Sequence, residues 1–258
     1  ANLKKNSVSL GLINYKKIED LDSSLKIRGS YNNNKIIVFD SIYFLDNERN
    51  VFEIESLNLS EDFKINSIKK IYIDFINNND IKNQISLKKD KEKYKIYGKS
   101  FDVSRLISEI LDDNNDNDNE SFSIFNNFNT NFSVNINKTY LDKDTYVNDL
   151  NGSIVFKNNK IDKINLDSSF SNKKKLTLTI NTNDNNEKIT TLFSGYPKPL
   201  VKQYKFIKGF EEGVLDFYSI KKNEISNSVL VIDNFKVQEV PILAKLLTLA
   251  SLQGIADL

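Results

Sequence analysis

Four residue types are absent from the 258-residue sequence: cysteine, histidine, methionine and tryptophan. Without cysteine the chain has no disulfides and no thiol chemistry, and without histidine acid–base work would fall to carboxylates, lysine or tyrosine. The lack of cysteine does not fix the compartment, because export does not require disulfides. The chain starts at Ala1 and has no methionine, so we interpret it as a segment of a longer protein.

A basic excess is missing as well. Lysine and arginine number 36 against 35 aspartates and glutamates, which gives a formal charge of +1. Proteins that bind nucleic acid normally carry a basic surplus. Only three arginines are present to form bidentate hydrogen bonds to phosphates, namely Arg28, Arg49 and Arg105. We therefore expect no nucleic-acid partner.

Long apolar runs are also lacking. The longest helical apolar stretch covers about a dozen residues, short of the ~20 that span a bilayer. The segment shows no signal-peptide pattern. Any membrane anchor is therefore expected to lie outside it.

The sequence contains no Gly-x-Ser-x-Gly elbow, no Walker loop and no metal-ligand cluster. The Asp/Asn-rich stretch 112–121 imitates a calcium loop, but Asn117 stands where the loop needs glycine, and Ser123 where it needs a bidentate glutamate. We expect no enzyme activity, no cofactor and no metal. A glycosidase with paired carboxylates on a β scaffold is left open by the residue types.

What the sequence does hold is alternation. It has 17 phenylalanines and 11 tyrosines, and short segments in which apolar and polar residues alternate recur every ten or so residues. Asn151-Gly152 predicts a hairpin turn, and crossover helices are missing, which favours an antiparallel sheet. Strands are predicted at 25–29, 36–44, 52–55, 57–59, 71–75, 85–87, 94–98, 128–136, 154–156, 164–166, 176–180, 189–193 and 229–237.

Three helices are predicted among these strands. Asp102 is an N-cap candidate for an amphipathic helix at 103–111, and a second helix is expected at 200–207. The third follows Pro241 and ends near Gly254, and it is apolar almost all round. Such a helix is either a core element or one that lies over an apolar groove or a membrane surface. Its apolar positions are Leu243, Leu246, Leu247, Leu249 and Leu252.

Three blocks of sequence resemble one family. Phe235-Lys-Val followed by Val240-Pro-Ile-Leu-Ala-Lys-Leu-Leu-Thr-Leu-Ala-Ser-Leu-Gln-Gly is similar to the C-terminal signature of the AsmA-like superfamily, in its YhdP-type branch from Gram-negative bacteria. Gly209-Phe-Glu-Glu-Gly-Val-Leu-Asp-Phe and Tyr97-Gly-Lys-Ser-Phe-Asp-Val-Ser-Arg-Leu-Ile resemble two upstream elements of the same family. The chain departs from the family pattern at Ser194-Gly195-Tyr196.

The resemblance implies a mainly β fold: a long, curved antiparallel sheet, open as a groove, with a few short helices and the apolar C-terminal helix. It would form one unit over 1–258, or two sub-divisions, 1–111 and 122–258, around the linker 112–121. The implied function is non-enzymatic phospholipid transport between the inner and outer membranes, in the periplasm, with an inner-membrane anchor outside this segment.

On this interpretation the partners are phospholipid acyl chains, with membranes contacted through regions outside the segment. The alternative is a structural or assembly β scaffold whose apolar face is an ordinary core without lipid, and alternation alone does not separate the two. The residues expected to line a lipid groove are Phe52, Ile54, Ile71, Ile73, Leu176, Leu178, Ile180, Leu215 and Phe217.

Overall fold

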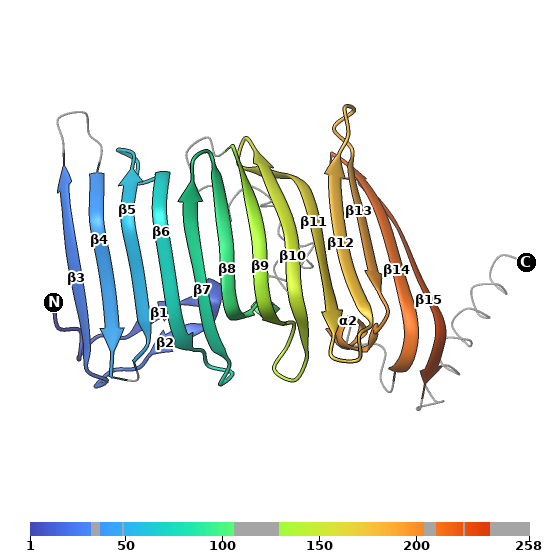
Figure 1. The fold of residues 1–258 in the computed structure, drawn as a ribbon, viewed down its shortest axis with the longest axis horizontal. Helices are drawn as coiled ribbons and strands as arrows, with labels where there is room; N and C mark the ends of the chain where they lie inside the picture. Colours follow the sequence, from blue (N-terminus) through green and yellow to red (C-terminus); the bar gives the residue numbers. More distant parts are fainter. Residues whose placement is uncertain (32–36, 48, 106–128, 204–209, 224, 238–258) are drawn as a thin grey trace, which may run out of the picture.

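The computed structural model describes residues 1–31, 37–47, 49–105, 129–203, 210–223 and 225–237. These form a thirteen-stranded sheet and a two-stranded sheet (Figure 1). The prediction of a mainly β chain with one long open sheet is confirmed. The large sheet runs in chain order through β3 (Ser23–Tyr31), β4 (Ile37–Asp46), β5 (Val51–Leu59), β6 (Ile65–Ile76), β7 (Lys82–Asp90), β8 (Lys93–Asp102), β9 (Thr130–Tyr140), β10 (Tyr146–Lys157), β11 (Lys160–Phe170), β12 (Lys175–Thr182), β13 (Lys188–Ser194), β14 (Phe210–Lys222) and β15 (Ile225–Val237).

One junction in the large sheet is parallel. β8 and β9 run in the same direction, whereas every other pair of neighbouring strands is antiparallel. Parallel neighbours cannot be joined by a tight turn and need a connection of a dozen residues or more. The prediction of a wholly antiparallel sheet is therefore wrong at this pair of strands, which the Asp/Asn-rich stretch separates in the sequence.

The predicted hairpin turn at Asn151-Gly152 is also wrong, because both residues lie inside β10. The turn after β10 is at Asn158 and Asn159, whose φ values of 50° and 63° are those of a type I′ turn. Gly152 has a different role. A Cβ atom there would lie 1.9 Å from the carbonyl oxygen of Asn165 in β11, so glycine permits the close approach of the two strands.

Little helix is present in the described residues. A 3₁₀ turn, η1, covers Gly11–Ile13, and α2 covers Lys198–Gln203, overlapping the helix predicted at 200–207. Asp102 accepts a hydrogen bond from the N–H of Ser104 at 2.9 Å, as an N-cap would. The rest of the predicted helix at 103–111 lies outside the described residues, as do the stretch 112–121 and the C-terminal helix with Leu243, Leu246, Leu247, Leu249 and Leu252.

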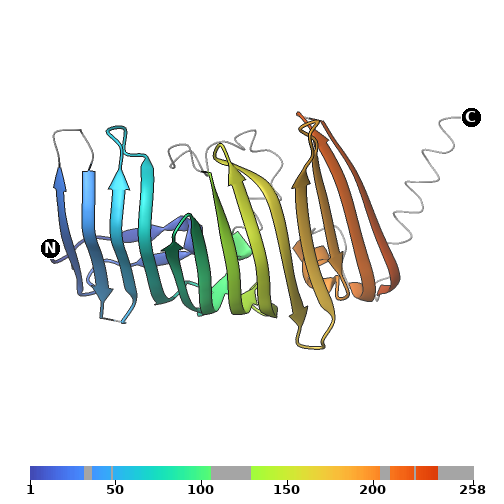
Figure 2. The same cartoon turned by 45° about the horizontal axis from the view of Figure 1, so that its top comes forward.

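A small hairpin covers one face of the large sheet. Its strands, β1 (Val8–Leu10) and β2 (Tyr15–Lys17), lie behind the sheet in Figures 1 and 2, near the end at which β4, β6 and β8 finish. We call this end of the strands the lower end. Tyr15 packs edge-on against Phe44 and Phe75, and its hydroxyl donates to Asp46 Oδ2 at 2.7 Å. The hairpin therefore adds both apolar burial and a buried hydrogen bond.

A buried lysine ties this hairpin to the preceding loop. Lys17 is 1% exposed, and its ammonium donates to the carbonyl oxygens of Asn6 at 2.6 Å and Ile18 at 2.9 Å. A buried charge is costly unless its donors are satisfied. Here backbone oxygens satisfy it, and the loop is fixed in return.

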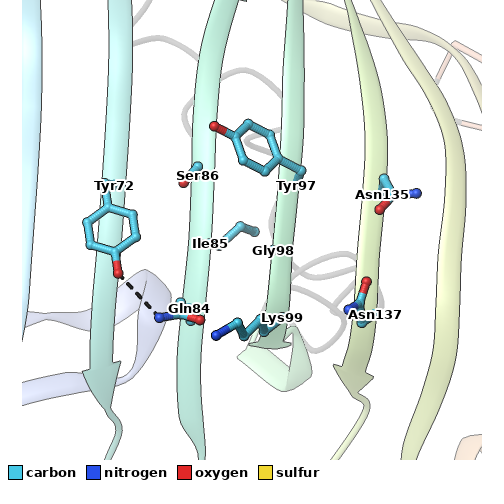
Figure 3. Close-up of a pocket in the computed structure, with 9 residues that line it drawn as sticks. All are labelled: Tyr72, Gln84, Ile85, Ser86, Tyr97, Gly98, Lys99, Asn135 and Asn137. Carbon is cyan, nitrogen blue, oxygen red and sulfur yellow. Dashed lines mark hydrogen bonds between the residues drawn. The ribbon is translucent and has the colours of Figure 1, made fainter.

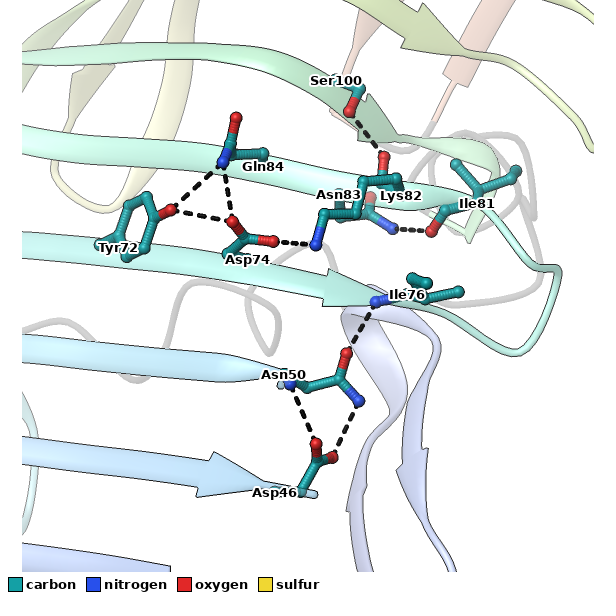
Figure 4. Close-up of polar contacts among 10 residues, drawn as sticks. All are labelled: Asp46, Asn50, Tyr72, Asp74, Ile76, Ile81, Lys82, Asn83, Gln84 and Ser100. Atoms are coloured by element: carbon teal, nitrogen blue, oxygen red, sulfur yellow. Dashed lines mark hydrogen bonds and ion pairs between the residues drawn. The ribbon is translucent and has the colours of Figure 1, made fainter. Parts of the chain in front are cut away.

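Buried amides and carboxylates close the lower turns of the sheet (Figure 4). Asn50 donates from its backbone and its side chain to Asp46 at 2.9 and 2.8 Å, and its side-chain oxygen accepts from the N–H of Ile76 at 2.9 Å. Two strands later, Asn83 Nδ2 donates to the carbonyl of Ile81, and its oxygen accepts from the N–H of Asp102. These bonds satisfy backbone groups that have no partner in the hydrogen-bond ladders between the strands.

Replacing Phe75 by alanine tests the aromatic core under the hairpin. Phe75 is 0% exposed and contacts Tyr15 and Phe52 with ring centroids 5.5 and 5.2 Å apart. We expect the free energy of unfolding, measured by urea titration, to fall by about 3–5 kcal/mol. Ile76→Ala, at a position 49% exposed, is the matched control and should change it by less than about 1 kcal/mol. Equal losses in the two variants would contradict this assignment of the core.

Candidate functional site

One apolar row crosses the whole large sheet. Residues that pair directly across neighbouring strands point to the same face, so the register identifies the row. It contains one residue from each of the thirteen strands, and twelve of these residues are apolar side chains. The row, called the central row here, consists of Ile27, Ile42, Ile54, Ile71, Leu87, Ile96, Val134, Gly152, Leu166, Leu178, Leu192, Phe217 and Leu230.

All nine predicted groove residues lie on the face that carries the central row, which we call the apolar face. Four belong to the row itself: Ile54, Ile71, Leu178 and Phe217. The other five lie two positions along the same strands, and side chains with this spacing share a face: Phe52, Ile73, Leu176, Ile180 and Leu215. The structure thus brings the predicted residues onto one surface, and their contact with lipid stays a prediction.

Part of this face is an ordinary closed core. Phe52 and Ile73 pack against the buried Tyr15, Phe44 and Phe75 under the N-terminal hairpin. At these positions the side chains are held by the protein's own hairpin. The lower end of β4 to β6 is therefore covered.

The lower end is covered again in the second half of the sheet. Leu176 packs with a cluster that includes Val147 and Phe170, together with Tyr196 from the loop before α2. Further along, Val201 of α2 is buried against Leu215. Both contacts lie toward the lower end, on the same side of the sheet as β1 and β2 (Figures 1 and 2).

Above these clusters, parts of the apolar face are less covered. Ile54, Ile71, Leu178 and Ile180 are half-buried, and none belongs to the three closed clusters of the described residues. At the ends of the row, Ile27 and Leu230 are 55% and 52% exposed.

Other parts of the apolar face are closed. Over the middle strands Val134 of the row is 7% exposed, and Tyr94 and Phe156 above it are buried. Leu192 and Phe217 of the row pack against the cluster at α2. The part of the face that is accessible to a ligand is therefore the rest of the central row.

Hydroxyl groups border this region on the last three strands. Thr190, Ser219 and Ser228 pair across β13, β14 and β15, each two positions from a central-row residue. Ser228 Oγ donates to Ser219 Oγ at 2.8 Å. On these three strands the apolar row thus has a polar margin toward the upper end, which is the end opposite the covered lower end.

The opposite face, which we call the polar face, carries charged and hydroxyl residues in matching rows. Lys70 contacts Glu55 at 2.6 Å and Glu53 at 3.6 Å across β5 and β6, and Thr179 hydrogen-bonds Thr191 across β12 and β13. The hydrogen bond from Lys70 lowers the pKa of Glu55 and raises that of Lys70. One face of the sheet is therefore apolar and the other mostly hydrophilic, although Phe193, Val229 and Val231 are exposed on the polar face of the last three strands.

Asp74 is the centre of a network on the polar face (Figure 4). It forms an ion pair with Lys82, accepts from Gln84 Nε2 at 2.7 Å, and accepts from the Tyr72 hydroxyl at 3.0 Å. Burial on its own would raise the pKa of Asp74, but the three donors outweigh burial and hold the pKa below its usual value. Burial and the Asp74 carboxylate raise the pKa of Tyr72, so its hydroxyl stays a donor.

Among the described residues, no cluster of three or more histidine, cysteine, aspartate or glutamate side chains could hold a metal ion. In the same residues no helix combines the length and the hydropathy needed to cross a bilayer. Sequence reasoning did not identify Leu87, Ile96, Val134 or Leu166 as members of the site. The alternation of these strands was the available signal, but only the register shows that they join the two predicted groups.

Comparisons with protein-family models, with curated proteins and with solved structures find no match for this chain. The resemblance to the AsmA-like superfamily stays a prediction.

Asp74→Asn tests the network on the polar face. A carboxylate whose pKa is lowered by folding adds stability above its unfolded pKa, and this stability is lost as the pH falls through the folded pKa. We therefore expect the variant to be less stable than the wild type at pH 7, and the difference to shrink as the pH drops below 3.8, the usual value for aspartate. Urea midpoints across the pH range measure this. Asp216→Asn, which removes an exposed carboxylate from the same face, controls for charge, and a difference independent of pH would contradict the assignment.

Proposed function

We propose that this protein carries phospholipid without chemical conversion, holding acyl chains on its apolar face and passing them between the inner and outer membranes in the periplasm. The observation that supports this most is the central row, which continues across all thirteen strands and is half-buried over most of its length. The resemblance of three sequence blocks to the AsmA-like superfamily supports the choice of lipid. In this proposal the sheet acts as a curved, open groove, and the membrane anchor belongs to regions outside the segment.

The physics of a sheet suits such a carrier. Neighbouring strands satisfy each other's backbone hydrogen bonds, so an apolar face can touch acyl chains without leaving polar groups unpaired. Each methylene that leaves water contributes about 0.8 kcal/mol, and a long acyl chain gains on the order of 10 kcal/mol. Transfer then needs no catalytic residue, only an apolar path.

The path runs across the strands. With neighbouring strands about 4.8 Å apart, the thirteen strands give the row a length of roughly 58 Å. Acyl chains would lie over Ile54, Ile71 and Leu178, above the covered lower end. Head groups would face the hydroxyl margin formed by Ser219 and Ser228.

The alternative is a structural or assembly scaffold without lipid. The observation that favours it is the set of three closed clusters, in which the hairpin, Tyr196 and α2 cover the lower part of the apolar face. On this interpretation the central row would be covered by protein in the same way. The two functions differ in one measurable quantity, the lipid content of the purified protein.

The test is mass spectrometry of organic extracts from the protein purified without detergent. We expect stoichiometric phospholipid with the wild type and its loss in Leu178→Asp/Ile180→Asp, because two carboxylates on the apolar face would have to leave water. The matched control, Thr179→Asp/Asn181→Asp, places the same charges on the opposite face of the same strand and should keep the lipid. Circular dichroism checks that both variants fold.

Two results would count against the carrier function. A folded wild-type protein without lipid would favour the scaffold. Equal lipid content in the two folded double variants would mean that lipid binds somewhere other than the central row.

A further inference from the structure

The polar face carries three tyrosines in one line across alternate strands. Tyr43 of β4, Tyr72 of β6 and Tyr97 of β8 are linked by the residues between them: Glu53 pairs with the first two, and Ser86 with the last two. We call these three tyrosines the tyrosine row. Since neighbouring strands lie about 4.8 Å apart, successive tyrosines are spaced by about 9.6 Å.

At least two of these rings lie along the sheet. The hydroxyl of Tyr72 donates to Asp74, two residues further along the same strand, which holds the ring along β6. Figure 3 looks onto the polar face and shows the rings of Tyr72 and Tyr97 nearly face-on. Tyr97 is 44% exposed. A ring in this orientation presents its π-face to a ligand that lies on the sheet.

Amides and a hydroxyl surround the two rings. A shallow hollow of about 470 Å³ lies between them, lined by Tyr72, Gln84, Ser86, Tyr97, Asn135 and Asn137. Ser86 is small and buried, so it leaves room between the rings. Amide side chains both donate and accept hydrogen bonds, as sugar hydroxyls and N-acetyl groups do.

The polar line continues beyond the tyrosines. Asn135 pairs with Tyr97, and its side-chain amide donates to Asn151 Oδ1 on the next strand at 2.6 Å. The register shift between β7 and β8 leaves Lys99 without a paired residue in β7, beside the hollow (Figure 3). The surface is therefore a straight track of flat rings and amides at right angles to the strands.

We propose that the polar face binds an extended β-1,4-linked glycan, which lies across the strands and stacks alternate sugar rings on the tyrosine row. The C–H face of a pyranose stacks on an aromatic ring, and its equatorial hydroxyls can bond the neighbouring amides. Two residues of such a glycan form its repeat, and their length is close to the two-strand spacing of the tyrosines. This site uses the face opposite the lipid path and does not rest on the proposed function.

The test is isothermal titration calorimetry of the full chain with the β-1,4-linked hexamer of N-acetylglucosamine. We expect binding by the wild type, and a loss of about tenfold in affinity in Tyr97→Ala, because one stacked ring is removed. Tyr97→Phe keeps the ring and should bind within about threefold of the wild type. Maltohexaose, whose α-1,4 links curve the chain away from a straight row, should bind more weakly.

Tyr218→Ala is the matched control. Tyr218 is 43% exposed and lies on the same face, on β14, outside the tyrosine row. Its removal should leave affinity unchanged. The proposal is overturned if the wild type does not bind the hexamer at millimolar concentration, or if Tyr218→Ala loses as much affinity as Tyr97→Ala. Tighter binding of hexathymidylate than of the hexamer would assign the surface to nucleic acid and overturn it equally.

Discussion

Backbone hydrogen bonding between neighbouring strands is the constraint on which the rest of this structure depends. Each interior strand of the large sheet finds partners in the strand before it and the strand after it, so its backbone is satisfied within a single layer. The side chains are then free to divide between two faces. Because paired residues share a face, a property repeated on each strand becomes a line across the whole sheet. The central row and the tyrosine row both arise from this register.

The apolar face is divided between packed and accessible parts. The lower end holds the N-terminal hairpin, α2 and the buried asparagine turns, and there the apolar face is packed by the protein's own residues. Higher up, half-buried residues such as Ile71 and Leu178 retain accessible surface. A ligand on the central row would therefore cover side chains that the fold leaves half-buried. The same division explains how one chain can expose an apolar surface and still have a stable, packed core.

Alternation along each strand was readable from the sequence because it is local. Leu176, Leu178 and Ile180 were expected on one face, and the structure places them there. The covering of the lower end was not predicted, since it depends on Tyr15 meeting Phe75 across 60 residues of chain.

The turn prediction at Asn151-Gly152 was wrong for a similar reason. Turn propensity is a local quantity, whereas the use of Gly152 is decided by the approach of β11. Lys17 would be expected in solvent, and only the backbone oxygens around it make its burial tolerable. The tyrosine row is likewise invisible without the register.

The large sheet is open, with β3 at one edge and β15 at the other among the described residues. In a closed barrel, strand number, tilt and stagger must agree, so adding a strand disturbs all the others. An open sheet carries no such condition. A duplicated hairpin at an edge would add two positions to each row and leave existing pairings intact. The reach of both surfaces could therefore grow or shrink in steps of one hairpin, through changes that need no compensating substitution elsewhere in the chain.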